Sequence, residues 1–355
     1  MTLLAAGSVA LAAVGDRLVA EPPASLHPVA WLGRALGPLD REWSHPRLAG
    51  VATALFVPFA AAGVVAVVVA LGMRLDPLVG AALAGLACFV STSRRMLLDE
   101  ARAVVAASET DLAAARERLR SLAGRDAAAL SAGEVRSAAV ESAAENLSDG
   151  LVAPLAGFAL LAPLSLPAAA GAAAWIKAVN TLDSTFGYRS VPMGWAPARL
   201  DDVVMWIPAR TSAGLLAVAA GRPDALRRAR PLARRPASPN AGWPMATLAV
   251  VLGVRLSKPG AYDLIEDRRS PDEEVRRTAG SRTRSGDSEA SETPRAERDD
   301  VPQTTGRSPV SEAGDSRTGS DDLPTRAAAE RGVAVVSRAG WLAFGLAAVG
   351  VIAAC

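Results

Sequence analysis

Residues 141–150 read Glu141-Ser142-Ala143-Ala144-Glu145-Asn146-Leu147-Ser148-Asp149-Gly150, and they open the stretch to Arg210 that decides the fold. Apolar runs separate this segment from three later polar clusters: Lys177-Ala178-Val179-Asn180-Thr181-Leu182-Asp183-Ser184, Arg199-Leu200-Asp201-Asp202 and Ile207-Pro208-Ala209-Arg210. A soluble core does not need this alternation, and a simple membrane span does not tolerate it. Ionisable groups within or beside a membrane are costly, so they indicate a functional site.

The composition favours a membrane protein. Half of the 355 residues are apolar and only 4% are aromatic, with long uncharged runs of Ala, Val, Leu and Gly. Such runs are typical of membrane helices. The net charge of +2 says little about partners, and we expect no nucleic acid among them. Cys88 and Cys355 lie in apolar surroundings and predict inert thiols, and two histidines are too few for a zinc site.

The apolar runs predict an all-α, polytopic integral membrane protein. Segments 47–74 and 77–93 predict a helical hairpin, and segments 3–19 and 333–355 predict the first and last apolar helices. Two further apolar segments, 150–176 and 203–221, contain prolines, and we expect them to be broken or re-entrant. No cleavable signal peptide is expected, because the N-terminus lacks a basic region and a small-residue cleavage pattern.

The polar segments have two different characters. Residues 94–149 alternate charges of both signs along Ala-rich sequence, which predicts two amphipathic cytoplasmic helices broken at Gly124-Arg125-Asp126. Residues 266–325 hold few apolar side chains, so they cannot offset the entropy of ordering and predict a disordered insertion. We therefore expect a membrane-embedded catalytic domain over 1–265, this insertion, and a C-terminal membrane helix over 326–355 that belongs to the same domain.

The distribution of arginine predicts the orientation. Loops 17–47, 94–149 and 222–235 carry most of the arginines near apolar segments, so they should face the cytoplasm. The turn at 74–76 and the N-terminus should then lie outside. We expect a multi-pass protein of the cell membrane whose active site faces the cytoplasm.

The motifs allow a functional and a structural interpretation. On a regular helix Glu141, Glu145 and Ser148 share one face, with Asp149 at its edge, which suits hydrated Mg²⁺ or merely a solvated face. Lys177 shares a helix side with Asn180 and Ser184, which suits a phosphate or simple capping and snorkelling. The adjacent acids Asp201 and Asp202 need a compensating cation, either a metal or an arginine.

Taken together and in order, the motifs resemble the CobD/CbiB family of cobalamin biosynthesis, the adenosylcobinamide-phosphate synthases. The resemblance covers about residues 10–265 and the last helix. Besides the four clusters quoted above, it is carried by Gly15-Asp16, Glu21-Pro22-Pro23, His27-Pro28-Val29, Pro154-Leu155, Gly187-Tyr188 and Ser238-Pro239-Asn240-Ala241-Gly242. The sequence departs from the family pattern at Thr185-Phe186 and in the polar insertion after Glu266.

The resemblance implies an enzyme that joins adenosylcobyric acid to (R)-1-amino-2-propanol phosphate, or a related amino alcohol, through an amide bond. It implies ATP as co-substrate, Mg²⁺, and contact with the lipid bilayer, and it allows other membrane enzymes of the pathway as partners. The expected catalytic residues are Glu141, Glu145, Asp183 and Asp202. The expected magnesium ligands are Asp149, Asp201 and Asp202. The expected substrate-binding residues are His27, Asn146, Ser148, Lys177, Asn180, Thr181, Ser184, Arg199, Arg210 and Asn240.

Two alternatives stay open. Broken helices and charges at membrane depth are also typical of a transporter of a small anionic or corrinoid solute. A non-catalytic membrane subunit that holds other pathway enzymes is the second alternative.

Overall fold

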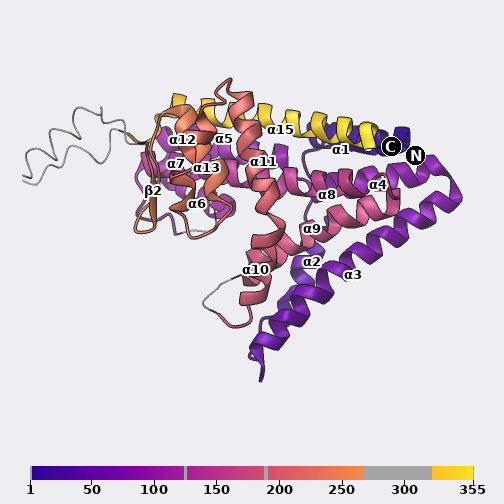
Figure 1. Ribbon diagram of the computed structural model, residues 1–355. Helices are drawn as coiled ribbons and strands as arrows, with labels where there is room; N and C mark the ends of the chain where they lie inside the picture. Colours follow the sequence, from indigo (N-terminus) through magenta and orange to yellow (C-terminus); the bar gives the residue numbers. More distant parts are fainter. Residues whose placement is uncertain (1, 124–125, 188–190, 267–321, 355) are drawn as a thin grey trace, which may run out of the picture. The chain divides into compact units, whose positions relative to one another are not determined.

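The computed structural model describes residues 2–123, 126–187, 191–266 and 322–354, and most of them are helical. Figure 1 shows the arrangement. The first helices are α1 (Thr2–Leu18), α2 (Pro28–Leu36), η1 (Gly37–Leu39), α3 (Pro46–Leu75), α4 (Pro77–Ser91), α5 (Arg94–Thr110), α6 (Leu112–Ala123) and α7 (Ala132–Leu147). The later elements are η2 (Ser148–Val152), α8 (Ala153–Leu161), α9 (Leu166–Phe186), α10 (Trp195–Val204), α11 (Trp206–Ala219), α12 (Ala225–Ala229), η3 (Leu232–Arg234), α13 (Gly242–Leu252), β1 (Leu256–Lys258), β2 (Tyr262–Leu264) and α15 (Arg326–Ala354).

Three stretches are long and apolar enough to cross a membrane. They are Pro46–Leu75, Pro77–Thr110 and Arg326–Ala354. Side chains such as Phe56 and Phe59 on α3 are exposed, at 74% and 64% of their surface. A soluble protein would bury such rings, so this face of α3 suits lipid. The predicted hairpin of 47–74 and 77–93 is present, with Asp76 capping α4 through Leu78 N–H.

Helix α1 runs beside α4 in the same direction. Ser8 Oγ donates to the carbonyl of Ala81 at 2.8 Å, and Gly15 faces the ring of Phe89 so closely that a Cβ there would lie 3.0 Å from it. The small residue lets the two helix backbones approach. This packing brings the C-terminal end of α1 to the start of α5.

The uncharged segment 150–176 folds back on itself. Helix α8 ends at Leu161, and Ser165 Oγ caps α9 by accepting from Ala168 N–H at 3.2 Å. Helix α9 then runs antiparallel to α3, because Gly171 packs on Ala62 whereas Trp175 lies against Phe59, with ring centroids 5.9 Å apart. The segment is therefore broken, and the polar end of α9 returns towards the end of α7. Whether the pair is re-entrant in a bilayer stays a prediction.

The charged region 94–149 contains three helices, where the sequence predicted two. The additional break lies at Asp111, whose carboxylate accepts from Ala114 N–H at 2.9 Å and so caps α6. Ser131 and Glu134 form a reciprocal capping box that starts α7. Residues 124–125 of the expected break lie outside the described residues.

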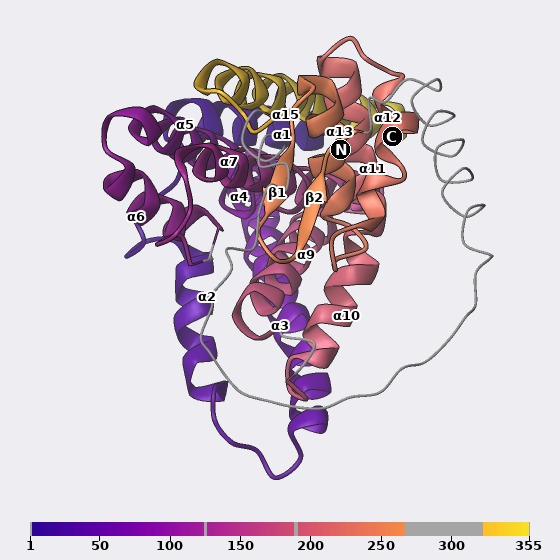
Figure 2. The ribbon, with the colours of Figure 1, turned by 90° about the vertical axis from the view of Figure 1, so that its left-hand side faces the viewer.

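The two short strands are an exception to the all-α prediction. Strands β1 and β2 pair antiparallel with Leu256 opposite Leu264 (Figure 2). Gly260 in the connecting turn has a φ of +73°, a conformation that favours glycine. Ser257 N–H donates to Ser137 Oγ at 2.8 Å, which ties the hairpin to α7.

Residues 1–266 and 322–355 group into one compact unit by their contacts. Within it α15 packs against α1, α5, α7, α8 and α11. The insertion predicted to be disordered, 266–325, lies almost wholly outside the described residues.

Candidate functional site

A π-helical turn places the first acidic residues. The backbone passes from α7 into η2, Ser148–Val152, and continues as α8 without a break in direction. A π turn inserts an extra residue into the helical repeat, and such turns are frequent at functional sites. The turn packs against α9 and α11, so the side chains around Asp149 face the two segments that carry the other polar motifs.

Five carboxylates from three separate segments form an acidic cluster, which we define as Glu145, Asp149, Asp183, Asp201 and Asp202. Burial raises the pKa of Asp149 to about 8, and the negative charges of Glu145 and Asp183 add to this effect. Burial likewise raises the pKa of Asp201 to about 9, with contributions from the other four carboxylates of the cluster. Both residues lie outside the three candidate spans. Such mutual repulsion is costly in the absence of a cation.

Asp201 has an orphaned atom. Its Oδ1 is buried and finds no hydrogen-bond partner among the described residues. Buried carboxylate oxygens are normally satisfied, and exceptions in native structures often mark a site for an ion or ligand. Asp201 thus offers a free oxygen that points into a crowded, acidic environment.

Lys177 on α9 supplies the opposite charge. Burial lowers its pKa, whereas the negative charges of Glu21 and Asp149 raise it. The loop before α2 approaches from the other side: His27 Nε2 lies 3.8 Å from Glu21 Oε2, and His27 Nδ1 accepts from Val29 N–H at 3.2 Å. The positive charge of Lys177 acts on both loop residues, although burial is the larger influence on each of their pKa values.

Glu21 is a site residue that the sequence interpretation did not select. It belongs to Glu21-Pro22-Pro23, which contributed to the family resemblance but was given no role. The signal was the rigid proline pair, which holds a carboxylate in a fixed position ahead of His27.

A second group supports the cluster at α10 and α11. Asn240 Nδ2 donates to the carbonyl of Asp202 at 2.8 Å, and its Oδ1 accepts from Arg210 at 2.7 Å. The Arg210 guanidinium lies 4.5 Å from the ring centroid of Trp206 and 5.1 Å from that of Trp243. Cation–π contacts on two rings and these hydrogen bonds fix its position. Arg210 and Asn240 therefore hold the backbone at Asp202.

Arg199 is the exposed partner of Asp202. Its side chain is 60% exposed and its nearest nitrogen lies 3.7 Å from Asp202 Oδ2. An exposed arginine at this distance contributes little to stability.

Glu141 is not part of the acidic cluster. Its carboxylate is fully buried and accepts from Ser137 Oγ at 2.7 Å and from the Tyr262 hydroxyl at 2.8 Å. It therefore links α7 to the β hairpin. The partners of the Glu141 carboxylate, Ser137 and Tyr262, are not residues with which we expected it to act.

Asn146, Thr181 and Ser184 have local hydrogen-bond partners, whereas the buried Ser148 Oγ has none among the described residues. Asn146 donates to the carbonyl of Ser142 on its own helix and lines a small gap towards α5. The hydroxyls of Thr181 and Ser184 donate to carbonyls one turn earlier on α9. Ser148 is buried in η2, and Asn180 is partly buried on α9. None of these contacts by itself indicates a ligand.

The acidic cluster could hold a magnesium ion only if waters or substrate phosphates completed its coordination shell. The described residues contain no group of three or more His, Cys, Asp or Glu side chains that could hold a metal ion alone. Mg²⁺, however, is usually bound by one or two carboxylates, with waters and substrate phosphates completing its shell. Asp201, with its orphaned oxygen, and one further carboxylate, from Asp149 or Asp202, would supply that donor set.

Comparison with known proteins agrees with this picture. The family model described as CobD/Cbib protein matches residues 9–285. A probable cobalamin biosynthesis protein CobD of Methanothrix thermoacetophila is 34% identical, over 74% of this chain and 87% of its own. The cobalamin biosynthesis protein CobD of Rhodobacter capsulatus is 39% identical, over 66% of this chain and 75% of its own. That of Klebsiella pneumoniae is 37% identical, over 74% and 84%. No solved structure matches the chain.

Proposed function

The chain belongs to the CobD/CbiB family of cobalamin biosynthesis proteins, and on that premise we propose that it is a membrane ligase that forms an amide bond at the expense of ATP. Its role in cobalamin biosynthesis implies a corrinoid substrate. The proposed substrates are adenosylcobyric acid and (R)-1-amino-2-propanol phosphate or a related amino alcohol. The product is then adenosylcobinamide phosphate.

One observation supports this proposal above the others. Asp149 in η2 is influenced by the charges of Glu145, Asp183 and Lys177. Asp201 on α10 is influenced by those of Asp149, Asp183 and Glu145, although up to 56 residues separate these groups. A reaction that brings together two phosphate-bearing substrates needs both a cation and positively charged side chains at one place. The cluster with Lys177 and Arg199 offers such a place.

The proposed reaction balances in two steps. A carboxylate oxygen of the corrinoid attacks the terminal phosphorus of ATP, which forms an acyl phosphate and releases ADP. The amine nitrogen of the second substrate then attacks the acyl carbon, and the carbon–oxygen bond to phosphate breaks. The nitrogen must give up its protons to a base as the amide forms.

The described residues divide these tasks by chemistry. Lys177 and Arg199 bind phosphate oxygens, the first as a buried point charge and the second as an exposed arm. Glu145 and Asp183 are placed to accept the proton of the amine. Asp149, Asp201 and Asp202 would hold Mg²⁺, which neutralises phosphate charge when bound. Arg210 and Asn240 do not touch the substrates in this proposal; they position Asp202.

The same proposal includes the location. The three candidate spans indicate membrane association. The distribution of arginine supports a cytoplasmic position of the acidic cluster, where ATP is available.

Two measurements test the function together: product formation by purified protein in detergent, and solute flux into sealed vesicles that contain the protein. The wild type should form the amide product in detergent from both substrates, ATP and Mg²⁺, and Asp202→Asn should lose this by at least a hundredfold. A transporter would instead show Asp202-dependent flux into vesicles and no product in detergent. A scaffold would show neither, and either result would contradict the proposal.

A further inference from the structure

Four arginines gather where α1, α5 and α15 meet, and they are none of the residues assigned to the acidic cluster. Arg17, Arg94, Arg95 and Arg102 line a polar pocket of about 380 Å³, together with Ser337 and Trp341. Two carboxylates face them. Asp16 pairs with Arg94 at 2.8 Å, and Asp99 is shared by Arg95 at 3.3 Å and Arg102 at 2.7 Å. Two positive charges of the four are thus left without a matching negative charge.

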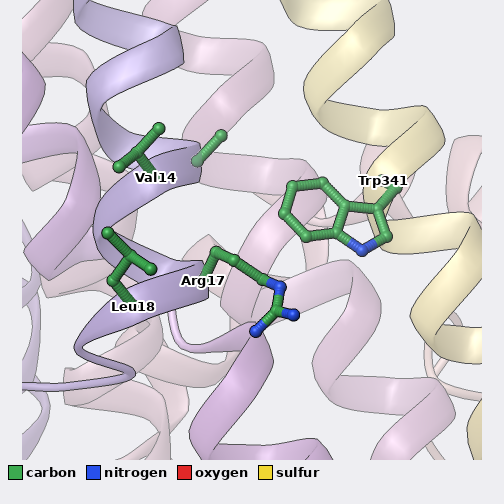
Figure 3. Close-up of a pocket in the computed structure, with 5 residues that line it drawn as sticks. Val14, Arg17, Leu18 and Trp341 are labelled. Atoms are coloured by element: carbon green, nitrogen blue, oxygen red, sulfur yellow. The ribbon is translucent and has the colours of Figure 1, made fainter.

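Arg17 holds one of these charges. Its backbone carbonyl accepts a hydrogen bond from Arg95, but within the described ranges its guanidinium has no hydrogen-bond or ion-pair partner. Figure 3 shows the side chain extending from α1 towards Trp341 on α15. The guanidinium is therefore available to an anion in the pocket.

An apolar groove adjoins the polar pocket. It measures about 200 Å³ and is lined by Ala13, Val14 and Leu18 together with Arg17 and Trp341. In Figure 3 Val14 and Leu18 lie one turn apart along α1, to the left of Arg17 and Trp341 in this view. Arg17 and Trp341 thus belong to both cavities, so one ligand with a charged end and an apolar end could fill the two.

The exposed surface of α15 changes from charged to apolar at Trp341, which lines both cavities. Before this point the exposed side chains include Glu330, Arg331 and Arg338, whereas after it they are Trp341, Leu342, Leu346, Val349 and Ile352. On α1 the exposed Leu3, Leu11 and Val14 precede Arg17. An aromatic ring and arginines at the end of an apolar surface are typical of the boundary between hydrocarbon and head groups.

We propose that this pocket binds the phosphate of an anionic phospholipid through Arg17 and its neighbouring arginines, while an acyl chain of the same lipid lies along Val14, Leu18 and Trp341. The charge excess selects an anionic head group, and the apolar groove selects a lipid over a soluble phosphate. Basic pockets between membrane helices on the cytoplasmic side are suited to such head groups. The lipid would stabilise the packing of α1 against α15. This role is independent of the reaction proposed for the acidic cluster.

Native mass spectrometry of the full-length protein in detergent tests this. The protein is titrated with phosphatidylglycerol or phosphatidylcholine of equal chain length, with and without inorganic phosphate. We expect one saturable site that prefers phosphatidylglycerol and is not displaced by inorganic phosphate at equal concentration. Arg17→Gln should weaken binding about fivefold, since a basic residue near a membrane surface contributes about 1 kcal/mol.

Arg74→Gln is the matched control. Arg74 is an exposed arginine at the end of α3, outside the pocket, so its loss should leave the affinity unchanged. Equal affinity for the two lipids, or equal weakening by Arg17→Gln and Arg74→Gln, would overturn the proposal. Displacement by inorganic phosphate would also overturn it, because the pocket would then take a soluble anion.

Discussion

Arg94 Nε donates to Asp16 Oδ2 over 2.8 Å, and the two side chains are only 6% and 1% exposed. The pair joins the end of α1 to the start of α5 across 78 positions of the chain. Asp16 Oδ1 also accepts from Arg95 N–H at 2.9 Å, and the Arg94 guanidinium lies 4.3 Å from the ring centroid of Trp341 on α15. Three helices distant in sequence therefore depend on one buried ion pair.

Breaking this pair should be strongly destabilising. Asp16→Asn leaves the Arg94 charge buried without its counterion, for which the expected cost is about 3–5 kcal/mol. Thermal unfolding in detergent should show a lower midpoint. The double variant Asp16→Leu with Arg94→Met should recover much of the loss, because no charge then remains buried. An unchanged midpoint in Asp16→Asn would show that the pair does not hold the helices.

Glu141 should act in folding rather than in catalysis. Tyr262→Phe removes one hydrogen bond from its fully buried carboxylate, which should cost about 1–3 kcal/mol of stability. The same variant should keep the kcat and KM of the folded enzyme, because Tyr262 and Glu141 lie apart from the acidic cluster. If Tyr262→Phe lowered kcat by a hundredfold or more at an unchanged unfolding midpoint, Glu141 would have a catalytic role after all.

Lysine should not replace arginine at position 210. Arg210 uses one nitrogen for Asn240 and another for the carbonyl of Pro239 at 3.3 Å, between two tryptophan rings. A lysine offers neither the planar stack nor the forked geometry. Losing a supporting partner of this kind typically costs about 10–100-fold in activity, so Arg210→Lys should lower kcat to that degree.

Arg222→Lys is the matched control for Arg210→Lys. Arg222 pairs with Asp224 on the surface, with a nitrogen–oxygen distance of 3.2 Å, and it does not touch the acidic cluster. The Arg222→Lys variant should therefore keep the activity of the wild type. Equal activities of Arg210→Lys and the wild type would show that Asp202 does not need the support of Arg210.

The acidic cluster should make stability depend on pH. The pKa of Asp149 is raised by burial and by Glu145 from its ordinary 3.8 to about 8. Between these values the folded chain retains a proton that the unfolded chain has released, so stability must fall as pH rises through this window. The unfolding midpoint of the wild type should drop as the pH rises from about 4 to about 8, and that of Asp149→Asn should drop less.

Magnesium should oppose that loss. A cation that binds only the folded cluster raises the midpoint by mass action, so Mg²⁺ at pH 8 should stabilise the wild type more than Asp149→Asn. Parallel pH curves for the two proteins, with equal responses to Mg²⁺, would show that Asp149 is not part of a cation site.

The long apolar helices were predictable because length and composition alone define them. The uncharged run between Arg47 and Arg74 is too long and too apolar for another structure, and it forms α3. The motifs around Asp149, Lys177 and Asp201 were recognisable in the sequence, and the charge of Lys177 acts on the pKa of Asp149, as that of Asp149 acts on the pKa of Asp201. The catalytic and binding roles of these residues stay predictions. The family resemblance, now shown by comparison with known proteins, is what identified these motifs as a set.

The details depended on local features that a regular repeat does not describe. Glu141 and Glu145 lie one turn apart within α7, whereas the π turn from Ser148 onwards shifts Ser148 and Asp149 relative to the regular repeat. The β hairpin has strands of three residues, too short for an alternating pattern. Its one signal was Pro259-Gly260, a turn-forming pair. The helix end at Asp111 had a capping residue as its signal.

The central claim is that one cluster, built from distant segments, joins a carboxylate to an amine with ATP. The most direct measurement mixes purified full-length protein with adenosylcobyric acid, the amino alcohol phosphate, ATP and Mg²⁺, and quantifies ADP and the amide product in the same sample. We expect equal amounts of both, with neither formed when Mg²⁺ is withheld or in Asp149→Asn, and both retained in the surface control Asp224→Asn. Amide formed without ADP, or undiminished synthesis in Asp149→Asn, would contradict the account.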